Sequence, residues 1–345
     1  AAYDFSGRSV SMLDANTLAI GAIGNDGNGN NSGHVRVYSW NGNAWVQKGV
    51  DINGEAAGDN SGLSVSMPDA NTVAIGAQFN DGNGSDSGHV RIYSWDGNAW
   101  LQKGGDLDGE ATIDYSGWSV SMPDANTVAI GAPYNDGNGA DSGHVRIYSW
   151  NGSIWVQKGM DIDGEAAEDY SGTSVSMPDA NTVAIGANYN SENGYASGHV
   201  RIYSWNGSSW IQTGMDINGE AVANQSGIYI SMADAHTVAI GAFNNNNANG
   251  NASGHVRVYD LSTLSIEEHT FDEAFSIYPN PTNAMFTVDV PNDSIKTISV
   301  VDITGKVVAS SNVATVDVSN LSSGIYVVKV ETTSGKTGTQ KLVRD

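Results

Sequence analysis

Residues 61–77 read SGLSVSMPDANTVAIGA, and residues 87–93, which follow after a short loop, read SGHVRIY. The first stretch recurs with small changes at residues 6–22, 116–132, 171–187 and 226–242. The copies are spaced by 55 residues throughout. A fixed period of this size predicts an array of supersecondary units, each too small to bury its own apolar face.

Each repeat contains four short stretches that alternate or run apolar between turn residues. In the second copy they are residues 63–67, 72–77, 89–94 and 100–103. Asp96-Gly97 supplies the positive φ values of a two-residue hairpin, which would place Tyr93 opposite Trp100. Four antiparallel strands per repeat without helices favour β-propeller blades over a solenoid, whose units usually carry fewer strands.

We therefore predict an all-β chain in which a β-propeller of four-stranded blades, with five copies in this chain, precedes a second domain. Leu264–Thr270 would supply the fourth strand of the last blade. The first copy opens partway through a repeat, at Ala1, so blades upstream of it remain an alternative to a five-bladed ring.

The negative charge of the chain is concentrated in the repeats. The chain has 38 acidic and 15 basic residues and a formal net charge of −23. Residues 276–345 hold 6 of each, so the whole excess lies in residues 1–275. Such a surface repels nucleic acid and anionic membranes, and it attracts divalent cations or basic partners, or serves solubility in a salty medium. There is no cysteine, and no run approaches about 18 apolar residues, so we expect no disulfide and no membrane span.

The loops between the second and third strands are rich in Asp, Asn and Gly. Oxygen donors separated by glycines suit Ca²⁺, the one cofactor that the sequence suggests. The candidate ligands are Asp26, Asn28, Asp81, Asn83, Asp86, Asp136, Asn138 and Asp141. The alternative is a set of turns that Asn and Asp side chains stabilise.

A histidine starts the third strand of every copy. These residues are His34, His89, His144, His199 and His255. The third strand lies two spacings of about 4.8 Å outward from the first, so a ring of these side chains diverges. This geometry favours packing between blades over a shared metal site.

Positions that differ between copies carry aromatic side chains on the acidic face of the predicted propeller. Aromatic rings beside carboxylates suit a ligand site, whereas the alternative is drift of unselected loops. The candidate ligand-binding residues are Phe79, Tyr115, Trp118, Tyr134, Tyr170 and Tyr189. Tryptophans that recur in four copies, such as Trp95 and Trp100, favour structural packing instead.

The motifs SVSM, VAIGA, GHVRIY and W-x-Q, in this order, resemble FG-GAP-type repeats, the blades of the integrin α-subunit head and of many bacterial surface proteins. The resemblance covers residues 1–261. It departs at Ser61, where the family has Phe before Gly. It departs again at residues 68–71, where Pro-Asp-Ala-Asn replaces the family's calcium loop. The family's calcium site therefore cannot be transferred to that turn.

The composition shifts near residue 262, and residues 276–345 contain about seven short alternating stretches. This pattern predicts a small Ig-like β-sandwich. The predicted domains are thus the propeller at 1–270, a linker at 271–275 and the sandwich at 276–345.

Four motifs occur in order in this last block: YPNP, DxxGKV, DVSxLxxGxY and a terminal KLVR. They resemble the type A C-terminal sorting domain of the type IX secretion system of Bacteroidota, rather than an ordinary Ig-like module. The resemblance implies that the type IX machinery recognises residues 276–345 and exports the protein, which is then released or anchored at the outer cell surface. The matching residues are Pro279, Asn280, Pro281, Asp302, Gly305, Lys306, Gly324, Tyr326 and Lys341.

Motifs of common enzymes are absent: there is no G-x-S-x-G and no H-E-x-x-H. The candidate carboxylates recur in several copies, whereas a catalytic pair is normally single. We therefore predict a secreted or cell-surface binding or adhesion module, not an enzyme, whose ligand is a surface glycan or a protein. The alternatives are a structural surface or filament protein and a propeller-fold enzyme that acts on polysaccharides.

Overall fold

The computed structural model describes residues 2–246, 250–261, 275–291, 293–302, 306–333 and 337–345. The chain divides into two compact units, Ala1–Leu264 and Ser265–Asp345. All regular elements of the described residues are β-strands, which confirms the all-β prediction. Among those residues, no helical segment has the length and hydropathy needed to cross a bilayer.

The described part of the first unit forms five antiparallel sheets, one for each repeat. The first sheet contains β1 (Ser6–Asp14), β2 (Thr17–Ala22), β3 (His34–Trp40), β4 (Trp45–Gln47) and β5 (Ile52–Asn53). Its order is β1-β2-β3-β4, as the four-stranded prediction requires. The short β5 also pairs with β3, because β4 covers only the end of that strand at Trp40 and leaves Val35 to pair with Ile52.

The next three sheets repeat this arrangement. The second contains β6 (Ser64–Asp69), β7 (Thr72–Ala77), β8 (His89–Trp95), β9 (Trp100–Gln102) and β10 (Leu107–Asp108). The third contains β11 (Ser119–Asp124), β12 (Thr127–Ala132), β13 (His144–Trp150), β14 (Trp155–Gln157) and β15 (Ile162–Asp163). The fourth contains β16 (Ser174–Asp179), β17 (Thr182–Ala187), β18 (His199–Trp205), β19 (Trp210–Gln212) and β20 (Ile217–Asn218).

The fifth sheet contains β21 (Tyr229–Asp234), β22 (Thr237–Ala242) and β23 (His255–Asp260). Its predicted fourth strand, Leu264–Thr270, lies outside the described residues. Five complete four-stranded blades therefore stay a prediction.

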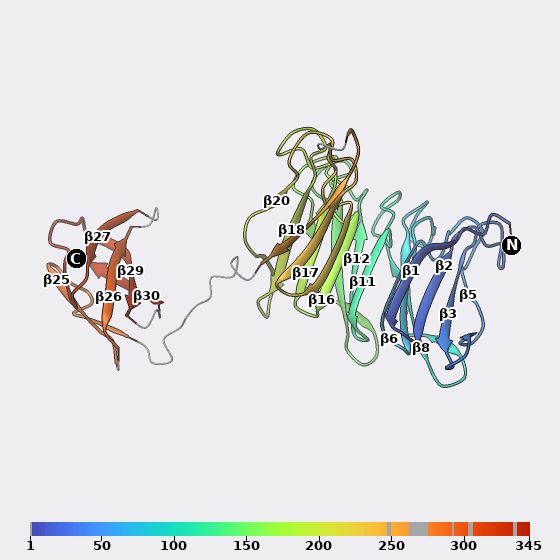
Figure 1. Cartoon of the computed structure of the whole chain (residues 1–345), viewed down its shortest axis with the longest axis horizontal. Helices are drawn as coiled ribbons and strands as arrows, with labels where there is room; N and C mark the ends of the chain where they lie inside the picture. The colour runs from blue at the N-terminus through green and yellow to red at the C-terminus, as the bar shows by residue number, and fades with distance from the viewer. Residues whose placement is uncertain (1, 247–249, 262–274, 292, 303–305, 334–336) are drawn as a thin grey trace. The chain divides into compact units, whose positions relative to one another are not determined.

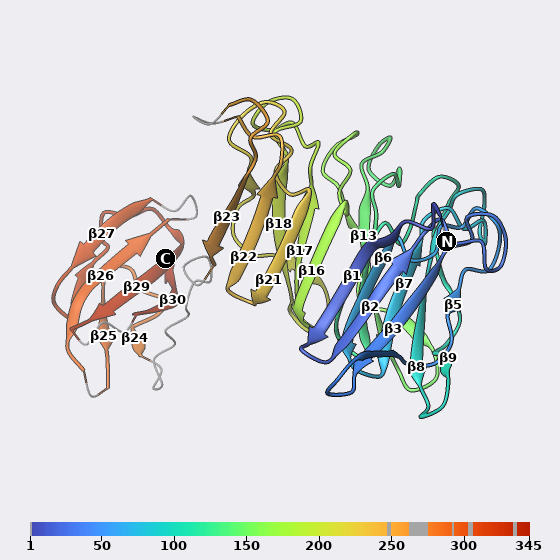
Figure 2. The same cartoon turned by 45° about the vertical axis from the view of Figure 1, so that its right-hand side comes forward.

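The sheets lie side by side in chain order, with β1, β6, β11, β16 and β21 as neighbours (Figures 1 and 2). In Figure 1 the first and last sheets stand at opposite ends of the row, so the sheets of the described residues form no closed ring. Burial agrees with this. Val256 and Val258 of β23 are 70% and 68% exposed, whereas the equivalent Val90 and Ile92 of β8 are fully buried.

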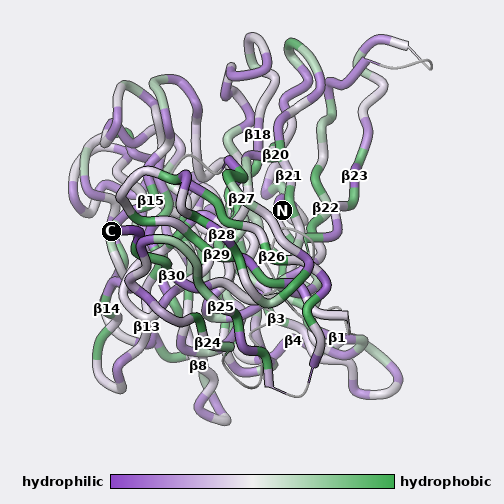
Figure 3. The backbone as a smooth tube through the Cα atoms, turned by 90° about the vertical axis from the view of Figure 1, so that its left-hand side faces the viewer, coloured by the Kyte–Doolittle hydropathy of each residue, from purple (hydrophilic) through white to green (hydrophobic). Residues whose placement is uncertain are grey.

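The apolar cores lie between successive sheets. Val90 and Ile92 of β8 pack against Met122, Val128 and Ile130 of the next repeat. Figure 3 shows hydrophobic stretches along the strands and mainly hydrophilic loops. Each such buried aliphatic side chain contributes roughly 1.5–3 kcal/mol relative to an exposed one. A single repeat therefore cannot bury its core without a neighbour.

The glycine of the recurrent AIGA stretch permits close contact between repeats. A Cβ at Gly76 would lie 2.1 Å from the carbonyl oxygen of Gly117 in the next repeat. Gly117 itself has a φ of +85°, a conformation that favours glycine. The hydroxyl of Ser64 donates to the same Gly117 oxygen at 2.8 Å, so this contact also joins the two repeats by a hydrogen bond.

The outer hairpin differs from the two-residue turn that Asp96-Gly97 predicts. Trp95 lies opposite Trp100, and Tyr93 lies opposite Gln102, so the predicted Tyr93–Trp100 pair is wrong. The reason is that the Asp96 carboxylate accepts the backbone N–H of both Asn98 and Ala99 at 2.7 Å, which stabilises a longer turn.

The tryptophans of this hairpin have a structural role. The Trp100 ring is buried, its Nε1 donates to the Lys48 carbonyl of the preceding repeat at 2.8 Å, and the Lys48 ammonium lies over both rings of the Trp95–Trp100 pair. These contacts agree with the packing interpretation of the recurrent tryptophans.

The described residues of the second unit form seven strands in two sheets, β24-β25-β28 and β27-β26-β29-β30. Their bounds are β24 (Ser276–Tyr278), β25 (Met285–Asp289), β26 (Ile295–Val301), β27 (Val307–Ser311), β28 (Thr315–Asp317), β29 (Gly324–Thr332) and β30 (Thr337–Arg344). Both sheets bury side chains in one core, among them Phe286 and Val328. Phe275, from the predicted linker, also packs in this core. The Ig-like topology stays a prediction.

Candidate functional site

The predicted ligand-binding aromatic residues lie together on the first unit and form a continuous row, here called the aromatic stripe. Four successive edge-to-face contacts have centroid separations of 5.3, 4.8, 4.9 and 5.1 Å. They run, in order, through Phe79, Tyr115, Tyr134, Tyr170 and Tyr189. The sixth residue, Trp118, lies beside Tyr115 and Tyr134, with centroids 6.4 and 6.0 Å away.

Two kinds of loop supply the stripe. Tyr134 and Tyr189 follow the second strands of their sheets, whereas Tyr115 and Tyr170 precede the first strands of the next sheets. The two sources alternate along the row, so contacts between the loops of successive sheets alternate with contacts between two loops of the same sheet. Tyr115 and Tyr170 both have positive φ values, 53° and 54°, which turn the chain at these positions.

The stripe is only partly covered by other residues. Tyr189 is exposed, and the other five side chains are half-buried. Partial burial raises the pKa of Tyr115, Tyr134 and Tyr170, so these phenols stay neutral and offer both a ring and a hydroxyl. Edge-to-face pairs contribute roughly 0.5–1.5 kcal/mol beyond area burial, so the rings hold one another in place.

A cavity of about 340 Å³ lies at the Tyr189 end of the stripe. Its lining includes Tyr189, Tyr195, Glu165, Glu168 and Glu192. Asp169 also lines the cavity, so four carboxylates beside two aromatic rings give it hydrogen-bond acceptors and a negative potential. It suits a ligand with hydroxyl or cationic groups and disfavours an anion.

The predicted calcium loops are held by their own side chains. The carboxylates of Asp26, Asp81 and Asp136 each accept a backbone N–H five residues on, at 2.8–2.9 Å. The latter two of these N–H donors belong to the predicted ligands Asp86 and Asp141.

The asparagines of these loops reach across to the next inter-repeat loop. The Asn83 amide donates to the carbonyls of Gly109 and Glu110, and Asn28 and Asn138 make the equivalent bonds. The hydrogen bonds within and between these loops use one carboxylate oxygen of each aspartate and the side-chain amide hydrogens of each asparagine. Calcium binding by the loops stays a prediction.

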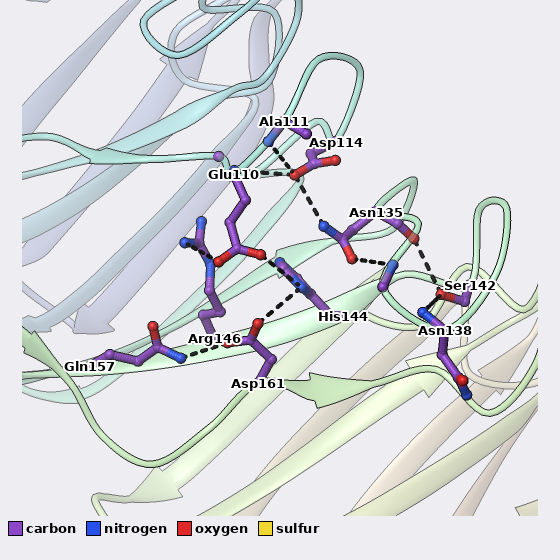
Figure 4. A network of polar contacts seen from close by, with 12 residues as sticks. Glu110, Ala111, Asp114, Asn135, Asn138, Ser142, His144, Arg146, Gln157 and Asp161 are labelled. Carbon is purple, nitrogen blue, oxygen red and sulfur yellow. Dashed lines mark hydrogen bonds and ion pairs between the residues drawn. The ribbon is translucent and has the colours of Figure 1, made fainter.

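A second polar group forms around the third-strand histidines (Figure 4). In the third repeat, Glu110 and Asp161 approach His144 from two directions, and each has one carboxylate oxygen 3.9 Å from the imidazole Nδ1. His144 is almost fully buried, and neither ring nitrogen has a hydrogen-bond partner among the described residues.

The other oxygen of each carboxylate is occupied. The side-chain amide of Gln157 donates to Asp161 Oδ1 at 2.5 Å, and the Arg146 guanidinium lies 3.5 Å from Glu110 Oε1. Burial lowers the pKa of His144 to about 4, with a further contribution from Arg146, so the imidazole is neutral at physiological pH. Burial also raises the pKa of Glu110, although Arg146 opposes this.

The same group recurs around His89 and His199, so there are three clusters among the described residues. The sets are Glu55/His89/Asp106, Glu110/His144/Asp161 and Glu165/His199/Asp216, with ligand atoms within 4.8 Å of one another in each. These acidic clusters are groups that could hold a metal ion.

Sequence reasoning did not identify these clusters, because it asked only whether the histidines meet one another. The sequence signal that could have identified the clusters is a constant spacing between the three residue types. In every set the glutamate precedes the histidine by 34 residues, and the aspartate follows it by 17.

The sorting-domain motifs contact one another in the second unit. The Asn280 amide donates to the Lys341 carbonyl at 2.7 Å, and the Val343 N–H donates to Asn280 Oδ1 at 2.9 Å. The Tyr326 hydroxyl donates to the Ser322 carbonyl, and the Lys306 N–H donates to Asp302. Pro279, Pro281 and Gly324 flank these contacts in sequence, and Gly305 lies outside the described residues.

Comparison with known families identifies both units. A model of the FG-GAP repeat matches residues 1–38, 53–93 and 107–148, and a model of the secretion system C-terminal sorting domain matches residues 276–344. The chain carries FG-GAP repeats and a type IX sorting domain. The sorting domain indicates export by the type IX system, so the protein is secreted or held at the outer cell surface.

Solved structures align with nearly the whole chain. A candidate 6-phosphogluconolactonase from Bacteroides uniformis is 10% identical, with a TM-score of 0.50, over 98% of this chain and 86% of that one. The β-propeller domain of the Trilobed protease from Pyrococcus furiosus is 9% identical, with a TM-score of 0.44, over 96% and 91% of the two chains. At these identities the likeness concerns the fold alone. A search of curated proteins found no significant match.

Proposed function

We propose that the FG-GAP unit is a non-catalytic binding or adhesion module whose ligand lies along the aromatic stripe. The observation that carries this proposal is that six variable positions from three successive repeats form one connected row of rings. Scaffold residues such as Trp100 recur at the same position in at least four copies, whereas these do not.

A glycan is the ligand that this surface fits best. Half-exposed rings offer faces on which sugar C–H groups stack, and the phenol hydroxyls and nearby carboxylates offer hydrogen bonds. The negative charge of residues 1–275 disfavours an anionic polysaccharide. We therefore expect a neutral or amino-containing glycan.

The distribution of carboxylates supports binding without turnover. Asp106, Asp161 and Asp216 occupy equivalent places, as do Glu55, Glu110 and Glu165, so no single pair is set apart as an acid and base. The polysaccharide-active enzyme remains the alternative, and detectable release of reducing ends by the purified chain would favour it.

We also propose that Ca²⁺ binds the loops that contain Asp81 and Asp136. These side chains are exposed, and each uses one carboxylate oxygen in its own loop, which leaves oxygen donors directed to solvent. Bound Ca²⁺ should raise the melting temperature, and the rise should disappear in the Asp81→Ala/Asp136→Ala double variant. An unchanged melting temperature on Ca²⁺ addition to the unaltered protein would remove this part of the proposal.

The decisive experiment for the binding function is a glycan array probed with residues 1–264, with and without a chelator. We expect binding to a defined set of neutral or amino-containing glycans that is lost in the Tyr134→Ala/Tyr170→Ala variant. Absence of binding to any glycan, together with ordered assembly of the pure protein, would favour the structural alternative.

A further inference from the structure

Three successive repeats place a histidine nitrogen and two carboxylate oxygens around a common point. We propose that each of the three clusters binds a divalent transition-metal ion such as Zn²⁺, through the histidine Nδ1 and one oxygen from each carboxylate. The cluster of Glu110, His144 and Asp161 is representative (Figure 4).

The buried histidine is the first reason. His89, His144 and His199 are almost completely inaccessible, yet their ring nitrogens have no hydrogen-bond partner among the described residues. A buried polar atom without a partner costs roughly 1–3 kcal/mol, so natural proteins seldom leave one at an equivalent place in three repeats. A bound cation would satisfy Nδ1.

The separations are the second reason. In the third repeat each carboxylate oxygen lies 3.9 Å from Nδ1, which is too long for a hydrogen bond. Ligands about 2.0–2.2 Å from a zinc ion lie roughly 3.3–3.8 Å from one another. Both nitrogen–oxygen separations are therefore within a few tenths of an ångström of those around a bound ion, and all three atoms lie within 4.8 Å of one another.

The orientation of the carboxylates is the third reason. In each cluster a glutamine amide donates to the far aspartate oxygen, and an arginine lies beside the far glutamate oxygen. Each carboxylate thus presents its remaining oxygen to the histidine. Metal-binding carboxylates are commonly positioned by such outer partners.

The ligand set determines the class of ion. One imidazole nitrogen with two carboxylate oxygens suits Zn²⁺ or Mn²⁺, whereas Ca²⁺ prefers six to eight oxygens. Glu110 is 45% exposed, so the fourth coordination position is open to water. This site is distinct from the calcium loops, whose ligands are oxygens alone.

A bound ion would join neighbouring repeats. Glu110 comes from the second repeat, whereas His144 and Asp161 come from the third. The metal would therefore cross-link adjacent sheets, and its binding free energy would add to the stability of the array.

The test measures metal stoichiometry on the whole chain. The chain is dialysed against a chelator, then titrated with Zn²⁺ by calorimetry, and bound metal is measured after equilibrium dialysis. We expect about three ions per chain, one for each cluster. The Glu110→Gln/Asp161→Asn variant should lose one of them. Excess Ca²⁺ should not displace Zn²⁺, which separates this outcome from the calcium proposal.

A matched control comes from the first repeat. There Asp51 lies 3.3 Å from His34, but no glutamate completes a cluster among the described residues. The Asp51→Asn variant should therefore keep all three ions. If the double variant fails to fold by circular dichroism, Glu110→Gln alone, at an exposed residue, serves instead. Unchanged stoichiometry in the folded variant, or no stoichiometric Zn²⁺ binding by the unaltered chain, would overturn the proposal.

Discussion

The ring of Tyr170 meets the ring of Tyr134 edge-on, with centroids 4.9 Å apart and planes inclined by 69°. Tyr134 follows β12 and Tyr170 precedes β16, so the contact joins loops of two successive sheets. Since Tyr115 and Tyr189 extend the row on either side, a ligand bound here would lie across the sheets rather than within one of them.

The centre of the aromatic stripe should dominate binding. We expect Tyr134→Ala to weaken glycan binding about 10–100-fold, equivalent to roughly 1.4–2.8 kcal/mol, because the ring contributes stacking area and holds its neighbours. Calorimetry with a glycan identified on the array would measure this. Tyr229→Ala is the control: this exposed tyrosine makes no ring contact among the described residues, so its loss should leave the affinity unchanged. Equal weakening in both variants would argue against the stripe.

Secretion should depend on the contacts of the sorting domain. Deletion of residues 276–345 should abolish export, and Asn280→Ala should reduce it strongly, because Asn280 holds the Lys341 and Val343 backbone through two hydrogen bonds. Quantifying the protein in medium and cell fractions would measure the effect. Asn312→Ala, at an exposed asparagine of the same unit, should export normally. Normal export of the deleted chain would show that another signal suffices.

The buried histidines predict a loss of stability in mild acid. Burial lowers the pKa of His89 and His144 to about 4, from a usual 6.5. As pH falls from 6.5 towards 4, the unfolded chain binds protons that the folded chain does not, so folding becomes less favourable. By pH 4 each histidine costs on the order of 3 kcal/mol.

Urea unfolding of the metal-free protein between pH 7.5 and 4.5 would measure this dependence. Glu110, whose pKa is raised by burial, acts in the opposite direction, so the comparison of variants is the informative step. His144→Gln should flatten the pH dependence, whereas His236→Gln, at an exposed residue, should not. If the free energy of unfolding changed equally with pH in the two variants, the pH dependence could not be assigned to His144.

The contact between Gly76 and Gly117 should be intolerant of a methyl group. Gly76→Ala would place a Cβ 2.1 Å from a backbone oxygen of the next repeat, and moving two sheets apart should cost about 2–4 kcal/mol. Gly105→Ala is the matched control, because nothing lies within 4 Å of its added Cβ. Thermal unfolding of both variants would compare them, and equal melting temperatures would refute the expectation.

Local pattern was enough to predict much of the fold. The period gave the repeats, and the apolar run at 72–77 coincides with β7 (Thr72–Ala77). These features depend on neighbours in sequence, through alternation and turn chemistry. The hairpin at Asp96 was mispredicted because a side-chain acceptor, rather than the Asp-Gly pair alone, determines its length.

By itself, the sequence determined the repeating sheets, the change of domain and the residue types available to a ligand. The tertiary structure decided which of them meet. It placed Tyr134 against Tyr170, and it brought Glu110 and Asp161, 51 residues apart, to one histidine. It also left the row of sheets open at Val256 and Val258. Such contacts depend on the twist and spacing between successive sheets, which arise from side-chain packing across the whole interface and not from any local pattern.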